Sequence, residues 1–287
     1  MREFAYSFIQ WNRYDSIGVT IVRIEKAERT RHREERGLVT IRIRTPEEIG
    51  YMREAGRILA ACHDQIARWM VPGITTAEID SRVEEFLYRR GATPEQKGYK
   101  GFPYATCASV NDVVCHGFPN STPLEPGDIA TIDIVVNKDG WLADRGWTYQ
   151  VGTINKPVAR LLHTTHKALM KGIQKAHIGS TLGDIGYEVE QTARQGRVGI
   201  VKSLVGHGIG RQMHEPPEVL HFGRPGTGMK LCEGMVFTIE PVFMLGSSGA
   251  VLWGDDGWTI SSADGSWGAQ YEHTIAVTKE GPLILSE

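Results

Sequence analysis

The chain has 287 residues, of which 41% are hydrophobic and 23% charged, and its formal net charge is −2 at pH 7. This composition is that of a globular protein with an ample core, and the charge gives no bulk electrostatic reason to expect a nucleic-acid or membrane partner. No apolar run could cross a bilayer, no secretory signal is visible, and the four cysteines form no CxxC pair, so we expect a cytoplasmic protein with free thiols.

The first 38 residues differ in composition from the rest of the chain. Between Arg23 and Arg36 almost every residue is charged, with both signs interspersed and no apolar face. We therefore expect residues 1–38 to be a poorly ordered extension or an exposed helix outside the core. Regular patterning begins at Val39, and a GTG start codon there would be read as valine from further upstream. We hypothesise that residues 1–38 reflect a start assigned too early.

Two helices are predicted after a short alternating strand at 39–44. The sequence "TPEE" (45–48) supplies an N-cap, a proline at the first helical position and acids in the first turn. The apolar residues that follow recur at helical spacing until Pro72-Gly73, which ends the helix. A capping box, Thr75 with Glu78, then opens a second helix.

The pattern of these helices recurs 106 positions later in the chain. "GITTAEIDSRVE" (73–84) aligns with "GSTLGDIGYEVE" (179–190), and each copy follows a longer amphipathic helix. The repeat predicts two α/β halves related by a pseudo-twofold, with the strand-rich segments 105–151 and 200–280 forming a central sheet between them.

Acidic residues interrupt several strands that otherwise look buried. "TIDIVVNKDGWLAD" (131–144) predicts a β-hairpin, yet Asp133 sits inside its first strand and Asp144 near the end of its second. Glu240 in "VFTIEPV" and Glu272 in "QYEHTIAVT" repeat the anomaly. A buried carboxylate costs several kcal/mol unless something pairs with it. One such acid is more often hydrogen-bonded than a ligand, but four together favour a shared role.

A metal site with two divalent cations accounts for these acids. Four carboxylates carry four negative charges, which two divalent ions would offset. Oxygen-rich ligation with one imidazole suits Mn²⁺, Fe²⁺ or Co²⁺ better than a thiolate-type structural zinc site does. Two such ions lower the pKa of a bridging water and polarise a carbonyl group.

The segment "VGHGIGRQMHEPPEV" (205–219) carries two histidines among glycines and prolines. Its resemblance to a phosphate-binding glycine motif is superficial, because a GxGxxG pattern would need glycine where Arg211 stands, and Pro216-Pro217 block a helix there. The glycines instead allow close backbone packing beside His207. A generic buried histidine remains the alternative for both His207 and His214.

Several segments, taken in order, resemble the type I methionine aminopeptidases, which belong to the metallopeptidase clan with the pita-bread fold. The matching segments are "TPEEIGYMREAGRI", "SVNDVVCHGFP", "IDI", "AD", "GHGIGRQMHEPPEV", "FTIEP" and "QYEHT". The resemblance runs from about Ile41 to the C-terminus. It implies an α/β (α+β) fold with pseudo-twofold related halves, whose central antiparallel sheet is covered by helices. Residues 39–287 would then form one metallo-aminopeptidase catalytic domain.

The same resemblance implies removal of the N-terminal methionine from nascent proteins and peptides, with a small second residue preferred. Five residues fill the family's metal-ligand positions, and Asp144 and Glu272 would bridge the two ions. The ligand set is Asp133, Asp144, His207, Glu240 and Glu272. The identity of the metal, cobalt, manganese, iron or zinc, stays open.

Further roles are implied for residues that would contact the substrate. His116 and His214 would contact the substrate and the tetrahedral intermediate, and Glu240 would act as a proton shuttle. His214 would help to stabilise the oxyanion, and His116 would hydrogen-bond the scissile amide nitrogen. The positions that match the methionine pocket are Tyr99, Phe102, Cys107, Met213 and Trp258.

Three residues depart from what is common among members of the family. Arg145 follows Asp144 where many relatives carry a small or hydroxyl residue. Because neighbours in a strand point to opposite faces, we expect Arg145 to point away from the metals. Gln96 and Met213 stand where cysteine and phenylalanine are common, so the pocket is expected to differ in shape.

Other functions remain open at this point. One is a sister peptidase on the same fold that cleaves Xaa-Pro bonds, and another is a binding module without catalysis, although all five ligand positions are filled. A paralogue with a narrowed substrate range is a third. The expected partners are peptide and nascent-chain N-termini, with a transient ribosome contact that no motif demonstrates. We expect a monomer with no nucleic-acid motif.

Overall fold

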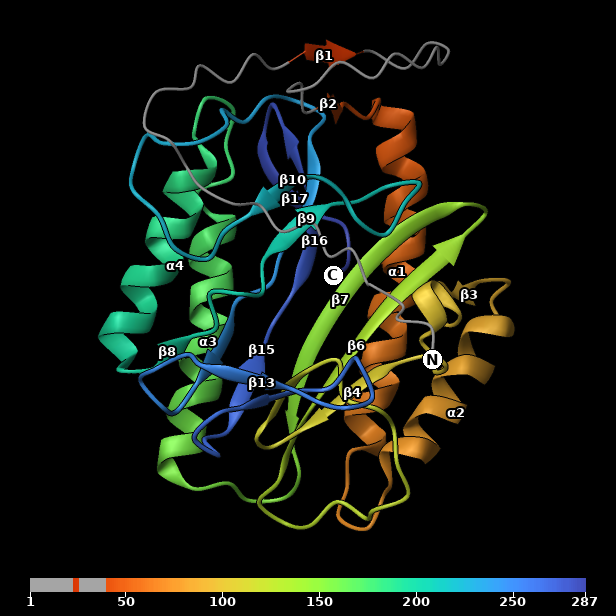
Figure 1. Ribbon diagram of the computed structural model, residues 1–287. Coiled ribbons are helices and arrows are strands. Elements are labelled where there is room, and N and C mark those ends of the chain that lie inside the picture. The colour runs from red at the N-terminus through yellow and green to blue at the C-terminus, as the bar shows by residue number, and fades with distance from the viewer. Residues whose placement is uncertain (1–22, 26–39) are drawn as a thin grey trace, which may run out of the picture.

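The protein is described by a computed structural model in which residues 23–25 and 40–287 are placed (Figure 1). The predicted N-terminal extension, residues 1–38, lies outside the described residues except for strand β1 (Arg23–Glu25). This strand pairs in parallel with β2 (Thr40–Arg42). Among the described helices, none has the length and apolar character needed to cross a membrane.

The first half of the molecule is built around the long hairpin formed by β6 and β7. Strand β6 lies between β3 and β4, pairs with both, and also pairs along its whole length with β7. Helix α1 packs on this hairpin and on α2. The elements are α1 (Pro46–Trp69), α2 (Thr76–Tyr88), β3 (Thr93–Pro94), the 3₁₀ turn η1 (Tyr99–Gly101), β4 (Cys107–Val110), β5 (Val113–Cys115), β6 (Ile129–Lys138) and β7 (Trp141–Gln150).

The second half again begins with a long and a shorter helix, followed by strands that belong to three sheets. Strands β10, β9, β11, β16 and β17 form one sheet in that order, β15-β12-β8 a second, and β13-β14-β5 a third. The elements are α3 (Lys156–Ile173), α4 (Leu182–Gly196), β8 (Gly199–Ile200), β9 (Gly206–Gly208), β10 (Glu215–Val219), β11 (Val236–Ile239), β12 (Val242–Met244), β13 (Val251–Trp253), β14 (Ile260–Ser262), β15 (Gly268–Gln270), β16 (His273–Thr278) and β17 (Gly281–Ile284).

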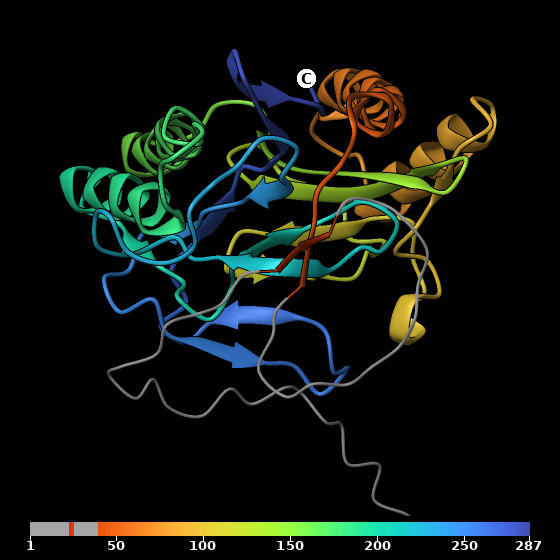
Figure 2. The same ribbon diagram turned by 90° about the horizontal axis from the view of Figure 1, so that it is seen from above.

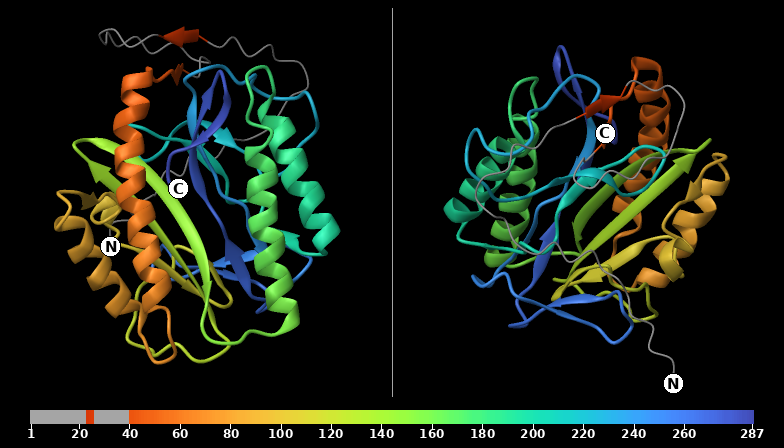
Figure 3. Two further views of the ribbon diagram at one scale, coloured as in Figure 1. Left: turned by 180° about the vertical axis from the view of Figure 1, so that it is seen from behind. Right: turned by 45° about the horizontal axis from the view of Figure 1, so that its top comes forward.

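Within the described part of the chain, the four α-helices lie on one side of the strands. Figure 2 shows them above the sheets, with α1 and α2 over one half and α3 and α4 over the other, and both views in Figure 3 agree. The largest apolar cluster joins α3 and α4 to β11, β15 and β16, and a second joins α1 and α2 to β6 and β7. The predicted class, helices covering antiparallel sheets, is confirmed.

The pseudo-twofold predicted from the repeat is visible at corresponding contacts in the two halves. The predicted capping box is present at the start of α2, and the equivalent residues at the start of α4 form another. Each N-cap residue also forms an isolated antiparallel bridge, Thr75 with Pro123 and Thr181 with Lys230. The first residues of α2 and α4 are therefore held by equivalent contacts in the two halves.

The equivalence extends to the strands that follow. "LEPGDIATID" (124–133) in the first half corresponds to "LCEGMVFTIE" (231–240) in the second. A glycine with positive φ precedes each strand, Gly127 at 105° and Gly234 at 84°. Strands β6 and β11 are thus equivalent, and Asp133 and Glu240 occupy the same position in the two halves.

Candidate metal centre

The four acids and one histidine predicted as ligands come from strands that meet between the two halves. Asp133 lies on β6 and Asp144 on β7, the two strands of the hairpin. His207 is the middle residue of β9, whereas Glu240 directly follows β11 and Glu272 directly precedes β16. Since β11 pairs with both β9 and β16, the three second-half residues emerge from adjacent strands.

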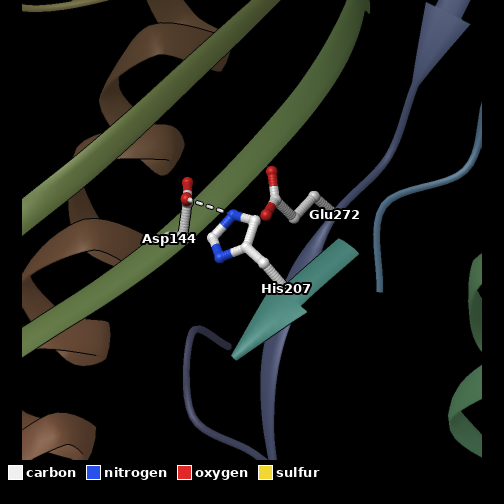
Figure 4. A group of neighbouring side chains, drawn as sticks. All are labelled: Asp144, His207 and Glu272. Atoms are coloured by element: carbon white, nitrogen blue, oxygen red, sulfur yellow. Dashed lines mark ion pairs between the residues drawn. The ribbon is translucent and has the colours of Figure 1, made fainter. Parts of the chain in front are cut away.

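Three of these residues form a tight group. Asp144, His207 and Glu272 each offer one ligand atom, and these atoms lie within 4.8 Å of one another. Figure 4 shows the three side chains converging from β7, β9 and the chain entering β16. The other two acids border this group. His207 Nε2 is 3.6 Å from Glu240 Oε1 and 3.7 Å from Asp144 Oδ2, and the Asp133 carboxyl contacts that of Asp144.

Burial makes these acids unusual in the metal-free protein. Desolvation raises the pKa of Asp133 to about 6 and that of Glu240 to about 8. The pKa values of Asp144 and Glu272 are raised well above their ordinary values, first by burial and then by the neighbouring acids. Burial lowers the pKa of His207 to about 4, so that its imidazole is neutral and free to donate a lone pair.

The donor set fits divalent metal ions. Among the described residues, Asp144 Oδ1 and Glu272 Oε1 are buried without a hydrogen-bond partner. Buried oxygens of this kind are costly unless a cation satisfies them. The set combines carboxylate oxygens with a single imidazole nitrogen, which matches borderline and hard divalent ions.

The orientation of His207 is set by its neighbours. Its Nδ1 donates to the Gly208 carbonyl at 3.1 Å, which leaves the Nε2 lone pair directed at the acids. The backbone N–H of His207 donates to Thr238 Oγ1 at 2.9 Å, and the Thr238 hydroxyl in turn donates to Glu240 Oε1 at 2.7 Å. One threonine therefore couples the position of the imidazole to that of the carboxylate.

Sequence reasoning missed three residues that support the ligands. Thr238 joins His207 to Glu240, and Gln270 donates to Glu272 Oε2 at 3.4 Å and also contacts Asp133. The Thr274 hydroxyl accepts from the Asp144 N–H and donates to the Asp144 carbonyl, both at 2.9 Å. The alternation of strands offered a signal, because each of these residues stands two positions from a predicted ligand and shares its face.

The two histidines expected to meet the substrate lie beside the predicted metal ligands. The His214 ring centroid is 4.4 Å from that of His207, and Tyr99 Oη is 3.0 Å from His214 Nδ1. Partial desolvation, followed by the nearby His207, Lys100 and His116, lowers the pKa of His214 to about 3. A neutral His214 that accepts from Tyr99 carries its proton on Nε2.

His116 stands at the edge of an aromatic cluster. Its backbone φ of 52° is unusual for a residue other than glycine, and burial lowers its pKa to about 4. The Trp258 ring lies 6.1 Å from His116 and 5.0 Å from Phe102, with edge-to-face geometry in both pairs. Phe118 and Phe102 are 5.4 Å apart, so apolar surface gathers beside His116.

The remaining predicted pocket residues are buried in nearby parts of the structure. Cys107 pairs with Asp133 in register between β4 and β6. Met213 is 6% exposed and packs in an apolar cluster that Tyr99 borders. Gln96 hydrogen-bonds the Asp133 carbonyl at 2.9 Å and the Val135 N–H, so its amide completes the edge of β6 between β3 and β4.

Arg145 points away from the metal centre, as the alternation of the strand predicted. Its Nη1 donates to the Ser286 carbonyl at 2.8 Å, and its guanidinium lies 4.6 Å from the Trp147 ring centroid. On the same side, the Arg145 carbonyl meets His63 of α1 at 3.0 Å. The Arg145 carbonyl therefore ties the hairpin to α1, and its guanidinium ties it to the C-terminal residues.

Comparisons with known proteins agree with this site. The model of metallopeptidase family M24 matches residues 50–279. A methionine aminopeptidase of Clostridium perfringens is 45% identical over 85% of this chain and 98% of its own, and one of Rickettsia prowazekii is 43% identical over 86% and 96%.

Solved structures show the same similarity in three dimensions. The methionine aminopeptidase from Rickettsia prowazekii superposes with a TM-score of 0.84 at 42% identity, covering 86% of this chain and 100% of that one. That from Thermotoga maritima gives 0.84 at 37% identity, covering 86% and 99%. The prolidase from Pyrococcus furiosus, at 21% identity and a TM-score of 0.68, shares the fold alone. The chain therefore belongs to metallopeptidase family M24 and, within it, to the type I methionine aminopeptidases.

Proposed function

We propose that this aminopeptidase removes N-terminal methionine at the centre formed by Asp133, Asp144, His207, Glu240 and Glu272. The observation that carries the assignment is the convergence of four desolvated carboxyl groups on one neutral imidazole, with two buried oxygens left unpartnered. Burying such a group of acids is unfavourable in free energy unless divalent ions bind to it. Sites with strongly shifted pKa values are typical of catalysis.

The five residues would hold two divalent ions. When bound, such ions supply a water of lowered pKa and Lewis acidity toward the carbonyl of the scissile bond. The oxygen-rich set with one imidazole is compatible with cobalt, manganese, iron or zinc. Thr238, Gln270 and Thr274 would keep the ligands in place before an ion arrives.

The chain's own side chains would move and hold the protons. Glu240, held by the Thr238 hydroxyl at the edge of the ligand group, would take a proton from the attacking water and return it to the leaving amine. His214 would donate its Nε2 proton to the oxyanion that develops on the substrate, because Tyr99 occupies Nδ1. His116 would hydrogen-bond the nitrogen of the scissile amide.

The pocket for the methionine side chain would form beside His116. Phe102 and Trp258 supply aromatic surface that is close to His116, and aromatic edges are favourable neighbours for a thioether. Tyr99, Cys107 and Met213 would complete it. A small second residue of the substrate would be preferred, as the family resemblance implies.

We further propose that residues 39–287 form one catalytic domain that acts in the cytoplasm as a monomer on nascent-chain N-termini. The match of the family model to residues 50–279 and the shared placement of ligands across both halves support a single domain. A transient contact with the ribosome would bring the site to its substrates.

The deciding experiment is hydrolysis of Met-Ala-Ser by metal-stripped protein titrated with Mn²⁺, Co²⁺, Zn²⁺ and, without oxygen, Fe²⁺. We expect metal-dependent release of methionine that falls by about 10³-fold or more in Asp133→Asn. Asp139→Asn, in the exposed turn of the same hairpin, is the matched control and should retain full activity. Metal binding without methionine release, together with cleavage of Xaa-Pro peptides, would reject the proposal.

A further inference from the structure

A buried ion pair lies beneath the segment 208–215 that carries His214. The guanidinium of Arg44 and the carboxylate of Glu215 contact each other, and their side chains are only 6% and 4% exposed. Glu215 Oε1 also accepts two backbone hydrogen bonds, from the N–H of Arg211 at 3.0 Å and from that of Gln212 at 3.1 Å. The Glu215 carboxylate thus closes residues 211–215 into a loop. His214 directly precedes Glu215 in this loop.

Arg44 anchors this loop to the chain that leads into α1. Its backbone N–H donates to the Gly234 carbonyl at 2.8 Å, just before β11. Its guanidinium packs so closely against Gly210 that a Cβ there would lie 2.0 Å from Arg44 Nη2. The absence of a side chain at Gly210 is therefore what allows the cation to reach Glu215.

The same loop also contacts the turn between β6 and β7, the hairpin that carries Asp133 and Asp144. Leu142 donates its backbone N–H to the Gly210 carbonyl at 2.9 Å. Arg211 lies 3.8 Å above the Trp141 ring and donates to the Gly140 carbonyl at 3.0 Å. The strands that carry Asp133 and Asp144 are thereby connected to the segment that carries His214.

We propose that the Arg44–Glu215 clamp, defined as this ion pair with its hydrogen bonds to Arg211 and Gln212, positions His214 relative to the metal-binding hairpin. A buried ion pair adds little net stability over apolar residues of similar volume, but its hydrogen bonds specify one geometry. The hydrogen bonds and ion pair of Glu215 go to Arg44, Arg211 and Gln212 and not to a predicted ligand, so we treat Arg44 and Glu215 as positioning residues.

The clamp controls His214 more directly than it controls the metal ligands. His207 is held by the pairing of β9 with β10 and β11 and by Thr238, all independent of the Glu215 carboxylate. Loss of the carboxylate would release the backbone at Arg211 and Gln212, and a displacement of about 1 Å can cost about 10²-fold in rate. The expected signature is a lower kcat with little change in KM and unchanged metal content.

This inference rests on the proposed role of His214, so the test separates the two. In metal-free protein, amide hydrogen exchange at Arg211 and Gln212 reports the clamp without substrate or activity. We expect exchange to accelerate about tenfold or more in Glu215→Ala and to stay near wild type in Glu218→Ala, an exposed position on the same strand. Absence of methionine release by the metal-loaded wild-type protein would instead reject the proposed function.

Kinetics on the metal-loaded proteins complete the test. We expect Glu215→Ala to lower kcat by about 10–100-fold with KM within about threefold, two metal ions retained, and the His214 ring signals shifted in the NMR spectrum. Glu215→Gln keeps an oxygen acceptor for Arg211 and Gln212, so it should recover part of the loss. Arg44→Lys keeps the charge but loses the planar fork and should fall between the two.

Two results would overturn the proposal. One is a folded, metal-loaded Glu215→Ala with wild-type kcat and wild-type exchange at Arg211 and Gln212. The other is a loss of kcat that tracks a loss of bound metal, which would make the pair merely structural. If Glu215→Ala does not fold, Glu215→Gln and Arg44→Lys are judged by the same two criteria.

Discussion

The two halves of the molecule contribute to the proposed metal centre in different ways, although their helices and first strands are equivalent. In the first half, β6 turns directly into β7, and continuous pairing carries Asp133 and Asp144 to one place. In the second half, the chain leaves Glu240 for β12, which belongs to another sheet. The companion ligands, His207 and Glu272, come instead from the strands on either side of β11.

The two halves differ in how many separate segments of the chain must be positioned to bring their proposed ligands together. The first-half ligands depend on one tight turn, where Asp139 and Gly140 have positive φ values of 53° and 78°. The second-half ligands depend on three strands, on Thr238, and on contacts with the first half. The second half should therefore be the more sensitive to substitutions that are remote in sequence.

The largest expected effect tests whether the two halves contribute equally to catalysis. Glu272→Gln should lower kcat/KM by about 10³-fold or more, as Asp133→Asn does, because either change removes a charge from the proposed metal set. The comparison uses methionine release together with metal content. Glu280→Gln, in the exposed turn after β16, is the control. If Glu272→Gln keeps substantial activity with both ions bound, Glu272 is not essential. The essential acids would then be Asp133 and Asp144 of the hairpin and Glu240, the equivalent of Asp133.

The acids also predict an unusual dependence of stability on pH in the metal-free protein. The folded-state pKa values of Asp133, about 6, and Glu240, about 8, lie above their ordinary values of 3.8 and 4.5. Below about pH 6.5 the lowered pKa values of His116, His207 and His214 oppose this effect. Between about pH 7 and 8 those histidines are neutral in both states and the folded protein binds more protons than the unfolded chain, so stability falls as pH rises. We expect the melting temperature to drop by about 2–5 °C over this range.

Bound metal should remove that trend. Divalent ions stabilise the ionised carboxylates, so the loaded protein should show little loss of stability up to pH 8, and metal binding should release protons. Differential scanning calorimetry with and without metal measures the first effect, and titration calorimetry in two buffers measures the second. A flat pH profile in the stripped protein would show that the four acids are not desolvated as described.

A pair of glycines in α1 tests how the first half depends on the last residues of the chain. A Cβ at Gly56 would lie 1.9 Å from the Leu285 carbonyl oxygen, whereas a Cβ at Gly50 would meet nothing within 4 Å. Gly56→Ala should cost about 1–3 kcal/mol through overpacking. Gly50→Ala should gain about 0.5–1 kcal/mol, since alanine is the better helix former.

Urea unfolding of the two variants gives the comparison directly. Similar effects at both glycines would mean that residues 285–287 do not pack against α1. Because Arg145 holds the Ser286 carbonyl on the same side of the hairpin, Gly56→Ala should also weaken that contact. The outcome therefore reports on the attachment of the metal-bearing hairpin to its covering helix.

The parts of the site that sequence alone predicted are those set by local patterns. Asp133 was conspicuous because it breaks an apolar strand, and the direction of Arg145 followed from alternation along β7. The capping box at Thr75 was predicted directly, and the repeat aligned Thr181 with it, where the structure has a second capping box. The assignment of all five ligands to one centre needed the family resemblance, because no local rule brings Glu272 beside Asp144.

The contacts that sequence did not predict join residues far apart in the chain. Arg44 and Glu215 are separated by 171 positions, and Thr274 and Asp144 by 130. Each residue alone is compatible with an ordinary surface or strand position, so its role emerges only when tertiary packing buries it. The sequence also did not predict that the side-chain amide of Gln96 completes the edge of β6.

The smallest expected effect concerns the two equivalent helix caps. Thr75→Ala and Thr181→Ala each remove a capping box and should each cost about 1 kcal/mol. The N3 acids are less alike, because Asp184 also accepts the Gly226 N–H at 2.9 Å. Hydrogen bonds from the backbone N–H groups of Thr181 and Gly226 lower the pKa of Asp184 below its ordinary value.

Thermal unfolding near pH 7, where Asp184 is ionised, should therefore rank Asp184→Ala as more destabilising than Glu78→Ala. Acidification through the lowered pKa of Asp184 should shrink the difference, since protonation removes the charge that those N–H groups favour. Equal effects at pH 7 would mean that the loop at Gly226 gains nothing from Asp184. The second half would then hold its ligands without the additional loop contact that distinguishes its cap from that of the first.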